Sequence, residues 1–469
     1  MPASKRRLTT VRSSVSSVDL RNAVVKRRPR ALTATTCVLA AASALLGVPT
    51  AASASLIGKP QAGGLRGTLT IETSPASLPV STDPYTQWIL KSIAMFKRVH
   101  PKVSISITDN ITGNAYLTKL SAQEAAKTAP DIFQGWTEAR LFPYAAAGRL
   151  TNLKPYILTS PSTSRLLSNF ALSTVSYKSG IYAIPLLEDS EVMYYNKALF
   201  RRYGLSAPST YSEFLHDISV FKSHGVTPIA LDTLNASWEA SILYTQLAMR
   251  VGGPALYRKV VLDGTARFDN PAYVKVGQMI QSLVKDGAFN SNYSSEADPY
   301  AQTLFSQGKA AMWDMGTWDI PPLWSALHNN LGWFPFPSVP KGKGNGSNVG
   351  MILNTDSALS ITNYASPQTK ALAWDFIKFI LSPSRQRAFA SLGEPIATNV
   401  QLTSANTDPV NASIHNAATT AKDPMFPWDD VLGTALGEDW DNASAAVYEG
   451  QNPATELGRV DQYRSQLAG

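Results

Sequence analysis

Alternation between strand-like and helix-like segments constrains the fold of this chain more than any other feature. GTLTIETSP and KVSISITD alternate apolar and polar residues, as half-buried strands do, while YTQWILKSIAMFKRVHP between them repeats its apolar residues with a helical period. A helix around Tyr116–Lys127 and a short buried strand in APDIFQGW follow. The order strand, helix, strand, helix, strand predicts an α/β fold in which helices cover a parallel sheet.

The chain is 469 residues long, so we expect two or more domains. Its middle region is more helical, with helices predicted at 238–251, 271–286 and 300–307 and strands in GVTPIAL, GKAAMWDMG and GMILNTDSALSI. LGWFPFPSVPKGKGNGSNVG is rich in proline and then in glycine, which predicts a crossing segment with a flexible loop. TKALAWDFIKFILSP then predicts an amphipathic helix.

The net charge of +8 belongs to the segment 1–54 at the start of the chain. Nine of the 42 lysines and arginines lie there with one of the 34 acids, so the other 33 bases and 33 acids cancel. A body with zero net charge has no excess of basic residues with which to hold a phosphate backbone. The sequence therefore predicts a protein that does not bind nucleic acid.

The same segment, 1–54, has the composition of an export signal. Basic residues up to Arg30 precede the uncharged stretch ALTATTCVLAAASALLGVPTAASA, which ends in the small residues Ala52-Ser53-Ala54. This pattern predicts cleavage after Ala54. A retained membrane anchor is the alternative. Cys37 is the single cysteine, and the apolar run follows it instead of ending at it, so we expect no lipidation there and no disulfide in the mature chain.

Motifs for catalysis and metal binding are absent from the sequence. None of the five histidines is spaced from another as metal ligands on a helix would be, and there is no HExxH, cysteine cluster or G-x-S-x-G motif. Adjacent acids occur at Glu188-Asp189 and Asp429-Asp430, but neighbours on a strand point to opposite sides, and such acids are usually solvated. We therefore expect no metal, cofactor or catalytic residue.

Residues 310–319 read AAMWDMGTWD and concentrate aromatic rings and carboxylates at the end of a predicted strand. The stretch is either a core strand with an ordinary turn or one wall of a ligand site. A sugar would suit such a wall, because its apolar C–H face stacks on tryptophan and its hydroxyls bond to polar side chains. In this interpretation Gly316 lets the chain approach closely, Trp318 is the platform, and Asp314 or Asp319 accepts hydroxyls.

Four motifs in order resemble those of family-1 extracellular solute-binding proteins, the carbohydrate receptors of ABC importers, which include maltose-binding protein. They are PDIFQGWTEARLFPYAAAGRLTNL, YAIPLLEDSEVMYYNKALFRRYGLSAPSTYSEF, LFSQGKAAMWDMGTW and AWDFIKFILSPSRQRAF. Each motif alone is weak, but together they carry the resemblance from about Gly67 to about Gly393. The resemblance implies a two-lobed periplasmic-binding-protein-like α/β fold with a ligand cleft between the lobes.

The resemblance also implies how the lobes are divided. We expect the export signal at 1–54, an N-terminal lobe at 65–190 plus 341–381, and a C-terminal lobe at 193–335 plus 385–469. The expected crossing segments are near 192–196, 334–340 and 381–385, where hinge closure would follow ligand binding.

Candidate site residues lie at strand ends, where open α/β sheets bind ligands. By resemblance to maltose-binding protein, these are Trp136, Arg140, Asp189 and Trp318. Trp238 matches a common site aromatic of the family, and Trp428 lies where C-terminal segments often bring another ring. With Asp314 and Gly316 these residues complete the predicted site. By contrast, we expect Trp88, Trp313 and Trp374 in the core.

The predicted function is therefore extracytoplasmic binding of a sugar or oligosaccharide and its delivery to the permease subunits of an ABC importer, by a monomer that is not an enzyme. Two alternatives stay open. One is a receptor for another solute, such as glycerol phosphate or a peptide, and a phosphate ligand would favour a site lined by arginine or lysine. The other is a glycoside hydrolase that uses acids in the same place, although sequence cannot show whether two carboxyls face each other.

Overall fold

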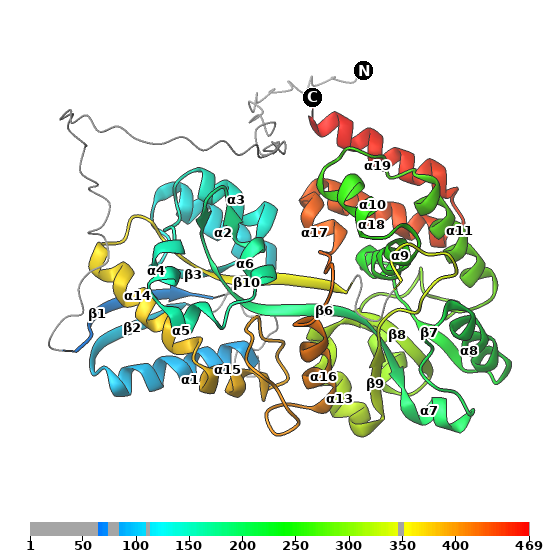
Figure 1. Cartoon of the computed structure of the whole chain (residues 1–469), viewed down its shortest axis with the longest axis horizontal. Helices are drawn as coiled ribbons and strands as arrows, with labels where there is room; N and C mark the ends of the chain where they lie inside the picture. Colours follow the sequence, from blue (N-terminus) through cyan, green and yellow to red (C-terminus); the bar gives the residue numbers. More distant parts are fainter. Residues whose placement is uncertain (1–63, 74–83, 109–112, 346–350, 469) are drawn as a thin grey trace, which may run out of the picture. The chain divides into compact units, whose positions relative to one another are not determined.

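The computed structural model describes residues 64–73, 84–108, 113–345 and 351–468 (Figure 1). The predicted export signal, the cleavage point after Ala54 and Cys37 lie outside these residues. The fold described below belongs to the compact unit Ala52–Leu467. Within the described residues, no helix is both long enough and apolar enough to cross a membrane.

One mixed sheet runs through this unit, with the strand order β2-β1-β3-β10-β6-β8-β7 and with β9 paired to β6. Its strands are β1 Arg66–Glu72, β2 Lys102–Thr108, β3 Ile132–Gly135, β6 Ile184–Asn196, β7 Thr227–Ala230, β8 Ala310–Gly316, β9 Leu331–Phe334 and β10 Ile352–Ile361. Strand β1 pairs in parallel with β2 and β3, which confirms the parallel sheet predicted from the alternating segments at the start of the body. Strand β10 is antiparallel to both β3 and β6, so it connects the first strands to the rest of the sheet.

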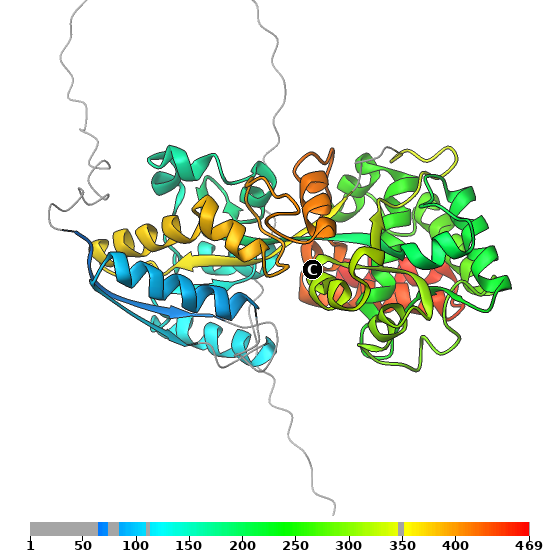
Figure 2. The same ribbon diagram turned by 90° about the horizontal axis from the view of Figure 1, so that it is seen from below.

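The first core lies between strands β1–β3 and the helices α1 Pro84–Val99, α14 Pro367–Ile380 and α15 Pro383–Ala390. Figure 2 shows α1 in blue and α14 in yellow on the same side of these strands. Helix α1 buries the apolar face that its period predicts, including Trp88 and Phe96. Trp374 of α14 is buried in the same core, so both tryptophans are core residues as predicted.

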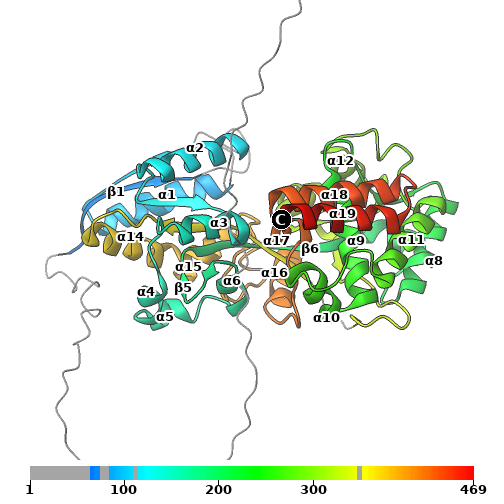
Figure 3. The same ribbon diagram turned by 90° about the horizontal axis from the view of Figure 1, so that it is seen from above.

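The second core surrounds helix α9 Ser237–Gly252, which is buried almost all round. Helix α9 packs against α18 Thr434–Tyr448, α11 Pro271–Lys285 and strand β8, and Figure 3 shows α9, α11 and α18 grouped together. A helix without a solvent-exposed polar face needs neighbouring elements on every side. The predicted helices at 238–251, 271–286 and 300–307 are all present, the last as α12 Tyr300–Ser306.

The remaining elements surround these two cores and form two smaller ones. They are α2 Gly113–Ala126, α3 Glu138–Ala146, α4 Lys154–Leu158, α5 Pro161–Ser164, α6 Asn169–Thr174, α7 Lys197–Arg202, α8 Tyr211–Ser223, α10 Pro254–Tyr257, α13 Ile320–Leu327, α16 Pro409–Ala418, α17 Trp428–Leu432, α19 Pro453–Ala468, the single turns η1 Arg258–Leu262, η2 Thr317–Asp319 and η3 His328–Asn330, and the hairpin of β4 Ser176–Tyr177 with β5 Gly180–Ile181. Helix α8 begins with a capping box, in which Thr210 and Glu213 each bond to the other's backbone N–H.

The segment predicted as a proline-rich crossing contains one further strand. Strand β9 pairs antiparallel with β6 before the prolines begin. Beyond it, the Arg250 guanidinium donates to the backbone oxygens of Phe336 (2.8 Å) and Gly344 (3.0 Å). Arg250, which is buried in helix α9, therefore anchors this segment at two points, Phe336 and Gly344.

Candidate ligand-binding site

Trp136 follows strand β3 directly and is half-buried against Tyr116, with ring centroids 5.8 Å apart. The exposed Arg140, one turn into α3, holds its guanidinium carbon 5.9 Å from the centroid of the Trp136 ring. Between them, Thr137 donates to the backbone oxygen of Thr355 on β10 at 2.6 Å. The predicted pair Trp136 and Arg140 is thus brought together, and its place is set by a contact to the strand that joins the two cores.

Asp189 lies on β6 opposite Asn354 of β10 and is buried. It accepts a hydrogen bond from the Thr317 hydroxyl at 3.0 Å, and the same hydroxyl accepts from the backbone N–H of Ser190 at 3.0 Å. Thr317 therefore fixes the end of β8 against β6. Its neighbour Trp318 is held close to Asp189 for the same reason.

Trp318 is partly exposed, with 38% of its surface accessible, and its ring covers Gly316. A Cβ atom on Gly316 would lie 2.1 Å from the Trp318 ring, so only glycine leaves room for the ring in this place. The half-buried Trp238, in the first turn of α9, meets Trp318 edge to face at 6.2 Å between centroids. Two rings from separate elements thus form one aromatic corner beside the end of β8.

The other residues of the stretch 310–319 have different surroundings. Trp313 is buried as predicted. Asp319 accepts from the Gln302 amide at 2.5 Å, and burial raises its pKa to about 6. Asp314 is only 6% exposed and accepts from the Gln246 amide at 3.3 Å, while its second oxygen has no partner among the described residues. Burial raises the pKa of Asp314 to about 7.

Trp428 corrects one expectation, because its ring belongs to the second core and not to a ligand-facing wall. It is 1% exposed and packs against Trp440, Tyr273 and Tyr257 at centroid distances of 4.6, 5.0 and 6.1 Å. Its place in the chain could not reveal this, because the partner rings come from three other segments. The buried ring anchors the start of α17 and so positions the two acids that follow it.

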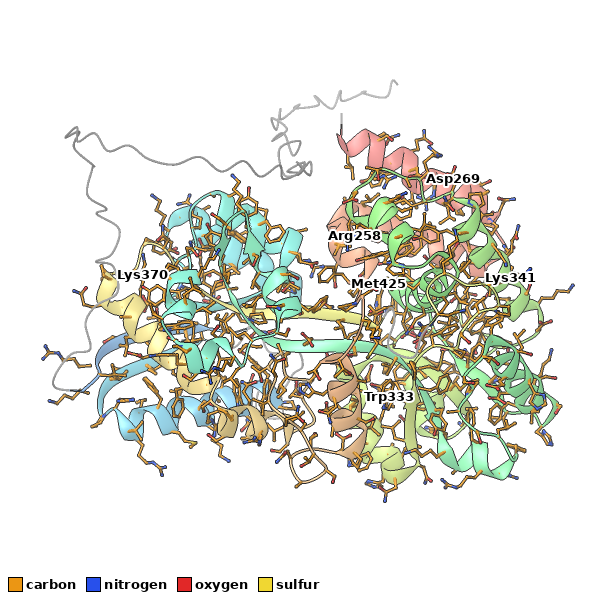
Figure 4. All side chains as sticks on the ribbon, in the orientation of Figure 1. Arg258, Asp269, Trp333, Lys341, Lys370 and Met425 are labelled. Atoms are coloured by element: carbon orange, nitrogen blue, oxygen red, sulfur yellow. The ribbon has the colours of Figure 1, made fainter. Side chains whose placement is uncertain are left out.

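Asp429 and Asp430 are only partly exposed, although adjacent acids of this kind are usually solvated. Asp430 hydrogen-bonds to the Asn354 side chain, and burial raises its pKa although the nearby Arg140 opposes the shift. Burial raises the pKa of Asp429 well above its usual range, as does the charge of Asp430. Met425, labelled in Figure 4, exchanges backbone hydrogen bonds with Met351 and Leu353 beside β10, which holds α17 near that strand.

Glu138 and Glu191 complete the set of acids that sequence reasoning missed. Burial raises the pKa of Glu138 to about 8, helped by the charge of Asp430. Burial raises the pKa of Glu191 well above its usual range, with Asp429 and Asp314 adding to the shift. Glu138 is also left-handed, with φ 51°, a conformation that costs energy for a residue with a side chain and recurs at binding sites. The sequence signal was the acid pair in the otherwise apolar context MFPWDDVL.

Two groups of side chains therefore stand near the middle of the sheet. Trp136, Arg140 and Glu138 belong to the end of β3 and the start of α3, and the charged groups Arg140 and Glu138 interact electrostatically with Asp430. Trp238 lies in the first turn of α9, Trp318 follows the end of β8, and Asp189 lies within β6. Within the described residues, no cluster of His, Cys, Asp and Glu has the arrangement of a metal site. A surface hollow of about 900 Å³ elsewhere, lined by rings of the first core such as Phe96 and Trp374, includes none of the predicted site residues.

Comparison with known proteins places the chain in a family. The model of the bacterial extracellular solute-binding protein family matches residues 79–387, about two thirds of the chain, and the protein belongs to this family. A multiple sugar-binding protein of Streptococcus mutans is 27% identical over 333 residues, covering 66% of this chain and 71% of its own. A melibiose/raffinose/stachyose-binding protein of Bacillus subtilis is 25% identical over 420 residues, covering 86% and 91%.

Solved structures agree on the architecture. A protein studied for xylan utilization by Caldanaerobius polysaccharolyticus is 28% identical and aligns with a TM-score of 0.71, covering 84% of this chain and 99% of its own. A chitin oligosaccharide binding protein aligns with a TM-score of 0.73 at 22% identity, covering 86% and 100%. The chain has the two-lobed α/β fold of solute-binding proteins, as expected from its motifs, and its family consists of binding proteins that act outside the cytoplasm.

Proposed function

We propose that this protein is the extracytoplasmic carbohydrate receptor of an ABC importer. The observation that carries the proposal is the aromatic corner of Trp238 and Trp318 beside Asp189. A pyranose has an apolar face that stacks on tryptophan and a rim of hydroxyls that donate and accept hydrogen bonds. A partly exposed pair of rings next to buried carboxyls offers both kinds of contact.

The relatives support a sugar rather than another solute. The family model covers most of the motif-bearing region, and the relatives named above are described as binding multiple sugars or melibiose, raffinose and stachyose. A glucose-binding protein of Saccharolobus solfataricus is also similar, at 24% identity over 216 residues. A phosphate ligand would need several cations, whereas Arg140 is the one cation among the predicted site residues.

Transport follows from closure of the two lobes around the ligand, which the permease then recognises. We place the crossing segments near 192–196 and 334–340, as the sequence predicts. Phe389 and Ile396 pack in the first core with Leu69, which favours a third crossing after Leu402 over one at 381–385. Trp136 and Arg140 would then close on the sugar from one lobe, and Trp238 and Trp318 from the other.

Export and the state of the mature protein remain part of the proposal. We expect cleavage after Ala54, no lipid on Cys37, a monomer, and no affinity for nucleic acid because the mature chain has zero net charge. N-terminal sequencing of the exported protein checks the cleavage point. A mature form that still carries Arg27-Arg28 would contradict it.

A thermal-shift screen against a panel of mono- and oligosaccharides tests the function. A sugar that binds the folded state raises the melting temperature by mass action, by an amount that grows with its concentration. Glycerol phosphate and short peptides belong in the same panel, and a shift with these alone would replace the sugar receptor by another receptor. Prolonged incubation with the binding sugars, followed by chromatography, should give no hydrolysis product. A product would identify the glycoside hydrolase instead.

A further inference from the structure

The acids at the middle of the sheet outnumber the cations there. Five carboxyls belong to this group: Glu138, Glu191, Asp314, Asp429 and Asp430. With Asp441 on α18 they form what we call the acidic cluster. None of its six members takes part in an ion pair with another described residue, and Arg140 is the one cation that acts on any of them. Burial raises the pKa of each of the six carboxyls, so each keeps its proton to a higher pH unless a cation compensates its charge.

Hydrogen bonds and strand pairing hold the buried members of the acidic cluster together. Strands β6 and β8 pair Glu191 with Gly316 and Met193 with Asp314. The Gln246 amide donates both to the backbone oxygen of Glu191 (3.1 Å) and to Asp314 (3.3 Å). Strands β6 and β8 are therefore fixed by pairing and by Gln246, so the carboxyls of Glu191 and Asp314 cannot move apart to reduce their repulsion.

The remaining members lie on three helices that pack against one another through α17. Helix α17 carries Asp429 and Asp430 and packs against α18, which carries Asp441, and also against α3, which begins at Glu138. Asp441 is linked to α9 by a hydrogen bond with Ser241. Five elements distant in the sequence, β6, β8, α3, α17 and α18, thus bring carboxyls to one place.

Three members of the acidic cluster are partly exposed to solvent and three are buried. Glu138, Asp429 and Asp430 are partly exposed, whereas Glu191, Asp314 and Asp441 are buried. The cluster therefore has a side open to solvent and a closed floor. A set of like charges on an open surface would be hydrated, but a floor of buried carboxyls lacks that compensation.

Two carboxyl oxygens at the buried floor of the acidic cluster lack hydrogen-bond partners. Asp314 is more than nine-tenths buried and its Oδ2 has no hydrogen-bond partner among the described residues, and the same holds for Oδ1 of Asp441. Buried polar atoms are normally bonded, and an exception indicates a missing partner. Once these carboxyls are ionised their oxygens can only accept, so a partner that fills this place must donate hydrogen bonds.

We propose that the sugar carries a basic amine, so that the ligand is an amino sugar or an oligosaccharide with a free amino group, bound with its ammonium in the acidic cluster. This inference rests on the proposed function. An ammonium has three N–H donors and no acceptor, which matches a site of carboxylate oxygens, and bonds between charged partners are about twice as strong as neutral ones. A hydroxyl in the same place would satisfy one oxygen and compensate no charge.

Matched ligands test the proposal. Isothermal titration calorimetry at pH 7 compares glucosamine oligomers, N-acetylglucosamine oligomers and glucose oligomers of the same linkage and length. The three differ at one substituent of each ring, and the amine alone carries charge. We expect the glucosamine oligomer to bind about tenfold tighter or more than either neutral one, and this preference to shrink as salt is added.

Asp430→Asn removes a charge from the cluster at nearly constant shape. We expect it to reduce the preference for the amine over the neutral oligomers. Asp375→Asn is the matched control, because Asp375 forms a surface ion pair with Lys378 on α14 in the first core. If Asp430→Asn fails to fold, as judged by its melting curve, Asp429→Asn replaces it.

The experiment distinguishes failure of the amine proposal from failure of the proposed sugar-receptor function. Neutral oligomers that bind as tightly as the amine, or a preference that Asp430→Asn leaves unchanged, would overturn the amine proposal and leave the sugar receptor standing. A folded protein that binds none of the oligomers would overturn both. Binding of a simple polyamine with the affinity of the amino sugar would show a receptor for amines and not for sugars.

Discussion

The two aromatic regions near the middle of the sheet have the same origin in the sequence but different surroundings. Trp136 and Trp318 each follow a strand closely, and each is partly exposed. Trp136 has the cation Arg140 beside its ring, whereas Trp318 has a second tryptophan and buried carboxyls. A ring that directly follows a strand therefore comes to the edge of the sheet where the candidate site lies. Residues from other segments then determine which group of a ligand this ring could contact.

Trp428 extends this comparison, because it was predicted as a site ring together with Trp318 and lies in the core instead. The difference is the number of rings around it. Trp318 has one ring neighbour and open solvent, while Trp428 contacts rings from α10, α11, α18 and the segment before α11.

Trp428→Ala should lower the free energy of unfolding by about 3–5 kcal/mol, because it removes a large buried side chain and leaves a cavity among rigid rings. Chemical denaturation measures the loss. Trp374→Ala, in the first core, is the matched control and should cost a similar amount. A Trp428→Ala protein with unchanged stability and weakened sugar binding would return Trp428 to the site.

Trp318→Ala should leave stability nearly unchanged and weaken sugar binding by about 1–3 kcal/mol, the scale of one large aromatic contact. This corresponds to about one to two decades in the dissociation constant. Calorimetric titration with the best sugar of the panel measures it. A badly destabilised variant that still binds sugar normally would assign Trp318 to the core and remove the main support for the aromatic corner.

The stability of the unliganded protein should fall as the pH rises from about 5 to about 8. Asp314 keeps its proton in the folded state up to its raised pKa of about 7, whereas the unfolded chain loses that proton near the ordinary value of about 4. Between these values the folded state binds more protons, so raising the pH favours unfolding.

Burial and the charge of Asp232 raise the pKa of Glu239 to about 9. The fall in stability with rising pH therefore continues above pH 7. We expect a difference in melting temperature of about 2 °C or more between pH 5 and pH 8. Asp314→Asn should flatten the profile below pH 7, with Asp375→Asn as the control. A wild-type profile that rises with pH would contradict the raised pKa values.

Arg140→Gln should have the smallest effect, weakening sugar binding by about 0.5–1 kcal/mol, because its contact with Trp136 is exposed to solvent. The same titration measures this change, and Trp136→Phe, which keeps a ring, tests the platform separately. An effect of Arg140→Gln as large as that of Trp318→Ala would mean that the two aromatic regions contribute equally.

Local pattern was sufficient for much of the architecture. The period of α1 identified its buried face, including Trp88. The parallel pairing of β1 with β2 and β3 also follows from the alternation of strands and helices. These features depend on residues close in the sequence, because backbone geometry repeats about every 3.6 residues in a helix and about every 2 in a strand.

The acidic cluster and the surroundings of Trp428 were decided by the tertiary structure alone. Periodicity tells which face of an element is apolar, but it does not tell which other element packs there. Glu191, Asp314, Asp430 and Asp441 come from β6, β8, α17 and α18, and each acid by itself resembles an ordinary surface residue in the sequence. Their pKa values rise only because the folded chain takes water away from all of them in one place, a property of the packing that no single segment carries.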